Sequence, residues 1–497
     1  MALARGSGVL LHPTSLPGPH GSGDLGLEAE RLLDWLERAQ QRYWQVLPLS
    51  PVGYGSSPYS SLSTFAGNPM LVDLRALVAR GWLAAADVPA ATELPARHLD
   101  FGRANGLRTA LLRRAAQTFF ARPAPEEHAA YEAFVEKHAP WLDDYSLFMA
   151  LHDAHAGAEW SSWESGLVHR EKAALARARA TLADGVGYHR FTQWLFFEQW
   201  ARLRAMAAAK HIRLIGDVPI FVAYHSADVW AHPELFHLDE ARRPTVVAGV
   251  PPDYFSATGQ RWGNPLYRWD KLAETGFAWW VDRLRALLEL VDVVRLDHFR
   301  GFAGYWEIPA EAETAVSGRW VDGPGAALFE ALRAALGNLP IVAEDLGLIT
   351  PDVAVLRDRF RFPGMKVLQF AFGSDAQNAF LPHNYERNAV VYTGTHDNDT
   401  TRGWFDQAPE AERHFVRRYL GTDGRDLPWD FIRLALGSVA DVAIVPFQDV
   451  LGLGSEGRMN RPGLAAGNWD WRFTWDEVPT DAATRLADLV RAYGRTS

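Results

Sequence analysis

The chain has 497 residues and a formal net charge of -10, with 50 Lys and Arg against 60 Asp and Glu. Apolar residues make up 48% and charged residues 22%, which is typical of a soluble globular protein too long for one ordinary core. The acidic balance and the lack of a basic run argue against a nucleic-acid partner. No cysteine is present, which excludes disulfides and thiolate metal sites.

The sequence also bears on where the protein acts. No apolar stretch is long enough to span a membrane. The first residues lack the basic region, apolar stretch and cleavage site of a secretory signal peptide. We therefore expect a cytoplasmic protein without a membrane partner, and the absence of cysteine fits that compartment.

Short apolar runs that end in turn residues predict eight β-strands along the chain. Helical periodicity predicts helices between them, including 27–38, 107–120, 143–155, 191–209, 277–291 and 326–336. Segment 223–270 is predicted as a long loop region, and an irregular stretch follows the fourth strand. The predicted strands occupy 8–12, 43–49, 212–222, 291–297, 339–347, 365–370, 388–393 and 442–446.

The strand runs are near-continuously apolar, which is typical of strands buried on both faces. Eight of them alternating with helices predict an α/β protein, a (β/α)8 TIM barrel. An open doubly wound sheet is the rival fold, but no glycine-rich phosphate fingerprint follows the first strand. Residues 1–70 and 211–497 are predicted to form the barrel with inserted loops. Residues 71–210 are predicted to form a mostly helical insertion between strands two and three.

Charged residues stand where four of the predicted strands end. Asp217, Asp297, Glu344 and Asp397 follow strands three, four, five and seven. Barrel active sites lie at the C-terminal ends of the strands, so these side chains should meet at one mouth. Clustered carboxylates repel one another, and at least one pKa should rise. One ionised and one protonated carboxyl is the pair that glycoside chemistry requires.

Other interpretations of the same residues stay open at this point. The Arg295–Asp297 pair alone is equally consistent with a structural ion pair and with a carboxylate nucleophile. Carboxylates with His298 and His396 could hold a divalent metal or abstract a proton beside a carbonyl. Arg295 would compete with a metal ion, which disfavours the first. A phosphate substrate is disfavoured because no glycine-rich turn follows strand seven or eight.

The motifs at these positions resemble the catalytic motifs of the α-amylase group of retaining glucan enzymes. The closer resemblance is to the 4-α-glucanotransferases called amylomaltase or disproportionating enzyme, and it spans residues 8 to 471. The catalytic motifs are Arg295-Leu-Asp297-His-Phe-Arg-Gly, Ala343-Glu344-Asp-Leu-Gly and Thr395-His-Asp397-Asn. Supporting motifs are His12-Pro-Thr-Ser-Leu-Pro-Gly, Tyr43-Trp-Gln-Val-Leu-Pro-Leu, Ser57-Pro-Tyr59, Gly216-Asp217-Val-Pro-Ile, Pro252-Asp253-Tyr-Phe-Ser and Gly467-Asn-Trp.

The resemblance implies a role for each catalytic carboxyl. Asp297 resembles the nucleophile, Glu344 the general acid and then base, and Asp397 the carboxylate that binds substrate hydroxyls and stabilises the transition state. The remaining matched positions are implied to bind substrate. They are Tyr54, Tyr59, Asp217, Asp253, Gln260, Trp262, Arg295, His298, His396 and Asn468.

The resemblance implies a glycosyltransferase of starch, glycogen or maltodextrin metabolism. It would cleave an α-1,4-glucan by a retaining double displacement and transfer the glucanosyl segment to the 4-OH of glucose or another glucan. Intramolecular transfer would give cyclic glucans. An α-1,4-glucan hydrolase and a non-catalytic glycan-binding barrel are the alternatives. No cofactor and no metal are expected.

Overall fold

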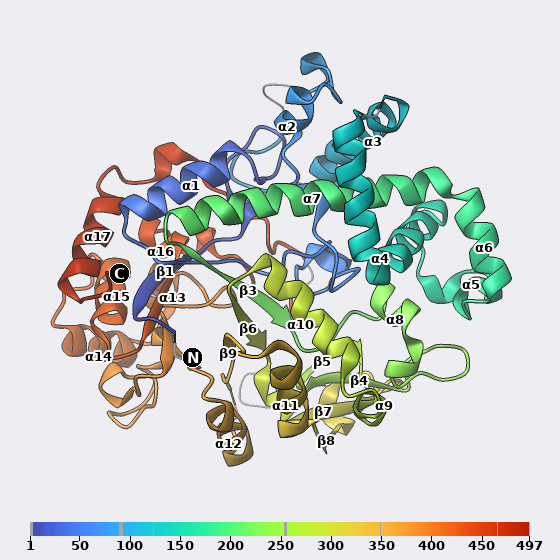
Figure 1. The fold of residues 1–497 in the computed structure, drawn as a ribbon. Helices are drawn as coiled ribbons and strands as arrows, with labels where there is room; N and C mark the ends of the chain where they lie inside the picture. The colour runs from blue at the N-terminus through green and yellow to red at the C-terminus, as the bar shows by residue number, and fades with distance from the viewer. Residues whose placement is uncertain are drawn as a thin grey trace.

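The barrel predicted from the sequence is present. The computed structural model describes residues 3–88, 93–122, 124–252, 256–347, 349–464 and 466–496. Eight parallel strands pair in the order β10-β11-β12-β1-β2-β3-β6-β9 (Figure 1). Their bounds are β1 Gly6–Leu10, β2 Tyr43–Gln45, β3 Arg213–Pro219, β6 Val293–Asp297, β9 Ile341–Ala343, β10 Gly364–Val367, β11 Ala389–Tyr392 and β12 Val442–Pro446.

The two end strands of this sheet meet and bring the barrel close to closure. The backbone N–H of Ala343, at the end of β9, donates to the Pro363 carbonyl beside β10 at 2.9 Å. The Asp345 carboxylate accepts from the Met365 backbone N–H at 2.7 Å. These contacts satisfy backbone groups that an open sheet edge would expose. The open doubly wound alternative is therefore wrong.

The strands are apolar throughout because both of their faces are buried. On β12, Val442 and Ile444 belong to the cluster inside the barrel. Ala443 and Val445, which alternate with them, pack in the outer cluster under the helices. A strand turns successive side chains to opposite faces, so burial of both faces removes the polar alternation of a half-exposed strand.

Helices surround the barrel, and α1 has the bounds that its apolar spacing predicts. The helices after the barrel strands are α1 Leu27–Arg38, α8 Ala227–Ala231, α9 Trp269–Glu274, α10 Ala278–Leu290, α11 Gly325–Leu336, α12 Pro351–Phe360, α13 Thr401–Gln407, α14 Glu410–Leu420, α15 Leu427–Gly437, α16 Phe447–Leu451 and α17 Ala482–Ala492. Within the described ranges, no helix combines the length and apolar character that crossing a bilayer requires.

A helical insertion separates β2 from β3, as predicted. Its helices are α2 Leu74–Ala79, α3 Phe101–Ala121, α4 Pro125–Ala154, α5 Ser165–Val168, α6 Lys172–Thr181 and α7 Ala183–Ala209. The insertion extends to one side of the barrel, and α7 returns from it to β3 (Figure 1). Trp200 of α7 donates to the Leu290 carbonyl at 2.8 Å. One apolar cluster runs through both parts, so a domain division at residues 71 and 210 stays a prediction.

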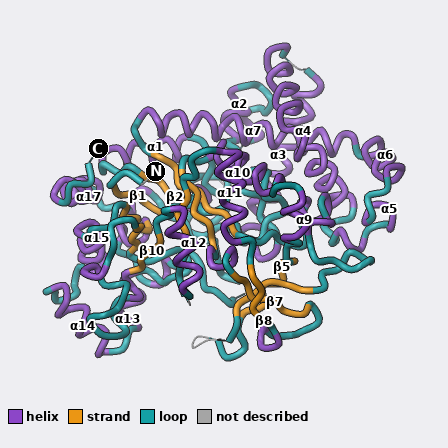
Figure 2. Tube along the Cα trace, turned by 60° about the horizontal axis from the view of Figure 1, so that its bottom comes forward, coloured by secondary structure: helices purple, strands orange, loops and turns teal. Residues whose placement is uncertain are grey.

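A second sheet was not predicted. The predicted loop region and the irregular stretch after β6 form four antiparallel strands in the order β5-β4-β7-β8 (Figure 2). These strands are short and their polar and apolar residues do not alternate strictly, so the period-2 signal is weak. The prediction that these segments contain only loops is therefore wrong. The strands are β4 Val246–Val250, β5 Gln260–Pro265, β7 Gly304–Pro309 and β8 Arg319–Asp322.

A buried arginine near the C-terminus connects helix and barrel. Arg495 is 0% exposed. Its guanidinium donates to the Leu436 carbonyl in the last turn of α15 at 2.7 Å and to the Gly6 carbonyl of β1 at 2.9 Å. Further donors reach the carbonyls of Ser438, at 3.1 Å, and Ala440, at 2.9 Å. A buried charge is tolerated when its donors are satisfied in this way.

We predict that Arg495→Ala destabilises the protein. The substitution removes the side-chain donor to the Leu436 and Gly6 carbonyls and opens a cavity, so the free energy of unfolding should fall by roughly 3 kcal/mol. Urea unfolding followed by circular dichroism measures the change. Arg491→Ala, on the exposed face of α17, is the matched control and should stay within about 0.5 kcal/mol. Equal effects of the two substitutions would contradict the role given to Arg495.

Candidate active site

The strand register brings the predicted carboxylates to one end of the barrel. Asp217 of β3 pairs with Arg295 of β6. Leu296 of β6 pairs with Ala343 of β9, which puts Asp297 and Glu344 side by side at the next position. The Glu344 backbone N–H donates to the Leu296 carbonyl at 3.0 Å. The sequence placed these residues on adjacent strands four and five, and that expectation is confirmed.

A cleft of about 690 Å³ opens at this end of the barrel. Its walls come from the loop after β2, from β5, and from the loops after β6 and β11. A late loop at 460–469 completes it. The predicted residues that line it are Tyr59, Gln260, Trp262, Asp297, His298, His396, Asp397 and Asn468.

Arg295 is the central cation of the site. Its Nη1 lies 2.8 and 2.7 Å from the two oxygens of Asp217 and 3.0 Å from Oδ1 of Asp297. Burial disfavours the charge, but Asp217 and Asp297 outweigh burial and hold the pKa of Arg295 well above its usual value. One permanently charged guanidinium therefore fixes two carboxylates relative to each other.

Tyr59 joins this network from the loop after β2. Its hydroxyl donates to Oδ2 of Asp217 at 2.8 Å, and its ring stacks on His396 with centroids 5.0 Å apart. Burial, followed by the charge of Asp217, raises the pKa of Tyr59 far above its usual value. The hydroxyl thus stays protonated and remains a donor.

Glu344 has the environment of a protonated carboxyl. Burial and then the neighbouring charge of Asp297 raise its pKa to about 8, although Arg295 and two backbone donors oppose the shift. Those donors are the N–H groups of His298, at 2.7 Å, and Leu346, at 2.9 Å. The expectation that crowding raises at least one pKa is met at this residue. Glu344 can therefore donate a proton at neutral pH.

His298 is held neutral beside the nucleophile candidate. Burial lowers the pKa of its imidazole to about 4, and the charge of Asp297 recovers only part of the shift. Its backbone is left-handed, with φ of 54°, a conformation that histidine adopts more readily than most residues. Among the described residues, none hydrogen-bonds its buried Nε2. The side chain lines the cleft, while Nε2 itself has almost no exposed surface.

Asp397 is 48% exposed at its side chain and is held by residues that were not predicted as site residues. Asn460 donates to its Oδ1 at 2.6 Å, and Arg458 donates to its backbone carbonyl at 2.9 Å. Buried Asp449 accepts from the Thr393 hydroxyl, at 2.5 Å, and from the Thr401 backbone N–H, at 2.8 Å, on either side of Asp397. The sequence places Asn460 in a loop and Asp449 just after strand eight, without indicating which partner each one meets.

The outer residues of the cleft are bonded among themselves. Trp262 of β5 is 39% exposed and donates to Gln260 at 3.1 Å. Its ring meets His298 edge-on at 4.8 Å. Asn468 accepts from the Arg461 backbone N–H and donates to the Leu464 carbonyl, both at 2.8 Å, so its amide shapes the late loop.

The side chains of two predicted site residues fall outside the described part of the structure. Asp253 lies outside the described residues, and the Tyr54 side chain is likewise outside the described part of the structure. Across the ranges that are described, no group of three or more His, Asp and Glu side chains is arranged to hold a metal ion. The carboxylates of the site face Arg295, Tyr59 and Asn460 instead.

Known proteins share this architecture over the whole chain. A family model described as 4-alpha-glucanotransferase matches residues 11–477. The chain is 54% identical to the 4-alpha-glucanotransferase of Thermus thermophilus over 100% of both chains. It is 49% identical to that of Synechocystis sp., covering 99% of this chain and 98% of the relative. The structure of amylomaltase from Streptococcus agalactiae in complex with acarbose superposes with a TM-score of 0.96 at 35% identity, covering 99% of this chain and 100% of that one.

Together, the fold and the site define a (β/α)8 barrel enzyme with clustered carboxylates at the C-terminal mouth. The family match and the full-length relatives then fix the family: the chain belongs to the 4-alpha-glucanotransferases. Its activity is the transfer of α-1,4-glucan segments, which makes it a glycosyltransferase. The hydrolase and binding-protein alternatives are thereby set aside.

The raised pKa of Glu344 predicts how stability depends on pH. Its pKa rises from an ordinary value of 4.5 to about 8. The folded state therefore binds a proton that the unfolded state has lost, and this stabilisation disappears as pH rises through 8. The Tm of the wild-type protein should fall more steeply between pH 5 and pH 9 than that of Glu344→Gln. Differential scanning calorimetry over this range measures both curves.

The matched control for the change in net charge is Glu136→Gln, at an exposed position on α4. Its Tm should follow the wild-type curve at every pH. Parallel curves for the wild type and Glu344→Gln would contradict the raised pKa.

Proposed function

We propose that the cleft carries out transfer by a retaining double displacement on α-1,4-glucans, with Asp297 as nucleophile and Glu344 as acid and then base. The observation that carries this proposal is the unequal environment of two adjacent carboxyls. Asp297 lies 3.0 Å from the Arg295 guanidinium, whereas burial and Asp297 raise the pKa of Glu344 to about 8. Retaining enzymes need one carboxylate to attack and one carboxyl to protonate.

In the first displacement, an oxygen of Asp297 attacks the anomeric carbon and forms a glycosyl ester. Glu344 gives its proton to the departing glycosidic oxygen, so the shortened glucan leaves as an alcohol. In the second displacement, Glu344 takes the proton of an acceptor 4-OH. That oxygen attacks the anomeric carbon and releases Asp297, so charge and protons balance over the cycle.

Charge develops on the sugar ring in both steps. Asp397, held by Asn460, is proposed to bind substrate hydroxyls and to stabilise the oxocarbenium-like transition state. The side chains of His298 and His396 are proposed to hydrogen-bond the same sugar, and Arg295 keeps Asp217 and Asp297 aligned. Gln260, Trp262 and Asn468 are proposed to contact neighbouring glucose units. Asp253 and Tyr54 complete the proposed set.

Transfer rather than hydrolysis requires that a sugar hydroxyl reaches the glycosyl ester before water does. Aromatic rings of Tyr59, Trp262 and Trp469 line the cleft, and such faces pack against sugar rings while excluding water. Acarbose is bound by the similar amylomaltase from Streptococcus agalactiae. We therefore propose that the cleft binds α-glucan donors and glucose or glucan acceptors.

Two variants test the assigned roles with maltotriose and an activated donor, α-glucosyl fluoride. Wild-type protein should convert maltotriose into glucose and a ladder of longer glucans. Asp297→Asn should abolish reaction with both substrates, by about 10⁴-fold or more. Glu344→Gln should lose the maltotriose reaction, yet it should still be glycosylated by the fluoride, whose leaving group needs no protonation. Thin-layer chromatography and mass spectrometry of the intact protein follow the two steps.

The outcomes separate the alternatives. Maltose and glucose alone from maltotriose would indicate a hydrolase, and unchanged maltotriose would indicate a binding protein. Reaction of the fluoride with Asp297→Asn but not with Glu344→Gln would reverse the two roles.

We also predict turnover without a metal. The carboxylates of the cleft are bonded to cationic and neutral protein donors, and a cation would have to displace Arg295. Dialysis against a chelator should leave the rate of maltotriose disproportionation unchanged. Loss of activity that calcium restores would contradict this prediction.

A further inference from the structure

Tyr59 stands at the tip of a loop whose own hydrogen bonds make it a stiff unit. Gly53 donates to the Ser60 carbonyl at 2.7 Å and Leu62 donates to the Pro51 carbonyl at 3.1 Å. The Ser61 hydroxyl adds a bond to the same Pro51 carbonyl at 2.8 Å. A ladder of this kind moves as one body, so the position of Tyr59 depends on how the base of the loop is held.

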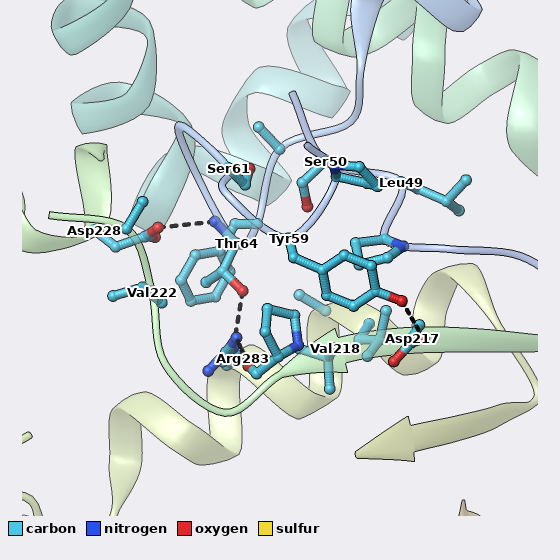
Figure 3. A pocket seen from close by; sticks show the side chains of 18 of the residues that line it. Leu49, Ser50, Tyr59, Ser61, Thr64, Asp217, Val218, Val222, Asp228 and Arg283 are labelled. Carbon is cyan, nitrogen blue, oxygen red and sulfur yellow. Dashed lines mark hydrogen bonds between the residues drawn. The ribbon is translucent and has the colours of Figure 1, made fainter. Parts of the chain in front are cut away.

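The base of the loop is held at Thr64 from two sides. The Thr64 backbone N–H donates to the Asp228 carboxylate at 2.8 Å, and its hydroxyl accepts from Nε of Arg283 at 2.8 Å. Figure 3 shows Thr64 between these two residues and Tyr59 directed toward Asp217. All of them line a small cavity of about 40 Å³. Burial raises the pKa of Asp228 to about 6, so the acceptor is ionised at neutral pH.

The same guanidinium also holds the strand that carries Asp217. Arg283 is 2% exposed and donates to the Pro219 carbonyl at 2.6 Å and to the Ile220 carbonyl at 2.9 Å, directly after Asp217. Its face packs on Trp280 with 4.6 Å from Cζ to the ring centroid. The planar fork of arginine lets one side chain serve acceptors on two separate segments.

We propose that Arg283 and Thr64 are positioning residues for transfer, and that they set the Tyr59 hydroxyl against Asp217 without touching substrate. Arg283 belongs to α10, the helix that leads into β6 and Asp297. One buried guanidinium therefore fixes the loop after β2, the end of β3 and the approach to β6 relative to one another. The inference rests on the proposed function, because it requires that the Tyr59–Asp217–Arg295 network supports transition-state geometry.

Thr64→Val tests this by removing one hydroxyl while keeping the backbone bond to Asp228. The rate of maltotriose disproportionation should fall about tenfold in kcat with little change in KM, since small misplacements act on the transition state. Thr64→Ser restores the hydroxyl and should return kcat to within about twofold of the wild type.

A double-mutant cycle with Tyr59→Phe tests whether Thr64 acts on kcat through the Tyr59 hydroxyl. Thr64 and Tyr59 side chains are not bonded to each other, yet Thr64→Val should add almost nothing once the Tyr59 hydroxyl is gone. A merely structural role for Thr64 would instead multiply the two losses.

The matched control is Thr192→Val in α7. Thr192 is fully buried, and its hydroxyl donates to the His189 carbonyl of its own helix at 3.0 Å. It should show a Tm shift like that of Thr64→Val and unchanged kcat.

The outcomes distinguish this inference from the proposed function. If Tyr59→Phe is impaired and Thr64→Val keeps wild-type kcat, or if the two losses multiply, the positioning role is wrong and the proposed site stands. If Tyr59→Phe itself turns over at the wild-type rate, the proposed role of Tyr59 fails and this inference fails with it.

Discussion

The site depends on one buried cation. The Arg295 guanidinium, only 3% exposed, binds Asp217 and Asp297 together. Without it, two carboxylates on neighbouring strands would repel each other in a medium that screens charge poorly. Removing one partner of such a pair leaves an uncompensated buried charge, which is far more costly than the pair itself. The carboxylates can cluster at the mouth of the barrel because β6 places Arg295 two residues before Asp297, on the same face of the strand.

The same charge arrangement separates the two catalytic candidates chemically. Asp297 lies against Arg295, whereas Glu344 lies beside Asp297 and accepts from the backbone N–H groups of His298 and Leu346. Arg295 attracts the Asp297 carboxylate at short range, whereas desolvation is the largest influence on the Glu344 carboxyl. Burial beside Asp297 raises the pKa of Glu344 to about 8, so this carboxyl carries a proton at neutral pH, as a displacement assisted by a proton requires. The asymmetry follows from strand position, since Asp297 shares β6 with Arg295, whereas Glu344 follows the neighbouring strand β9.

The sequence was sufficient for the barrel and for the carboxylates because both signals are local. A strand buried on both faces is recognisable from its own apolar residues. The charged residue at its C-terminal end is then located directly, because it comes where the apolar run stops. The antiparallel sheet β5-β4-β7-β8 was missed because its short strands lack that signal and pair only through tertiary contact. Asn460 and Asp449 were missed for a related reason: a lone amide in a loop or a lone carboxylate in a short helix shows no partner until the fold brings Asp397 or Thr393 to it. The contact between Arg283 and Thr64 joins residues separated by 219 positions, which no local pattern reveals.

Several of these long-range contacts share one physical principle. The loops of the mouth have few apolar side chains to pack, so buried polar groups beneath them take over that task. Asp228 and Arg283 hold the loop after β2, and Asp449 holds the segment around Asp397. A buried charge is costly unless every donor or acceptor finds a partner, and here the partners are backbone groups and threonine hydroxyls of the segments that are held. Desolvation of the charge is therefore offset only when the loop adopts one conformation, which couples the rigidity of the cleft to the stability of the barrel beneath it.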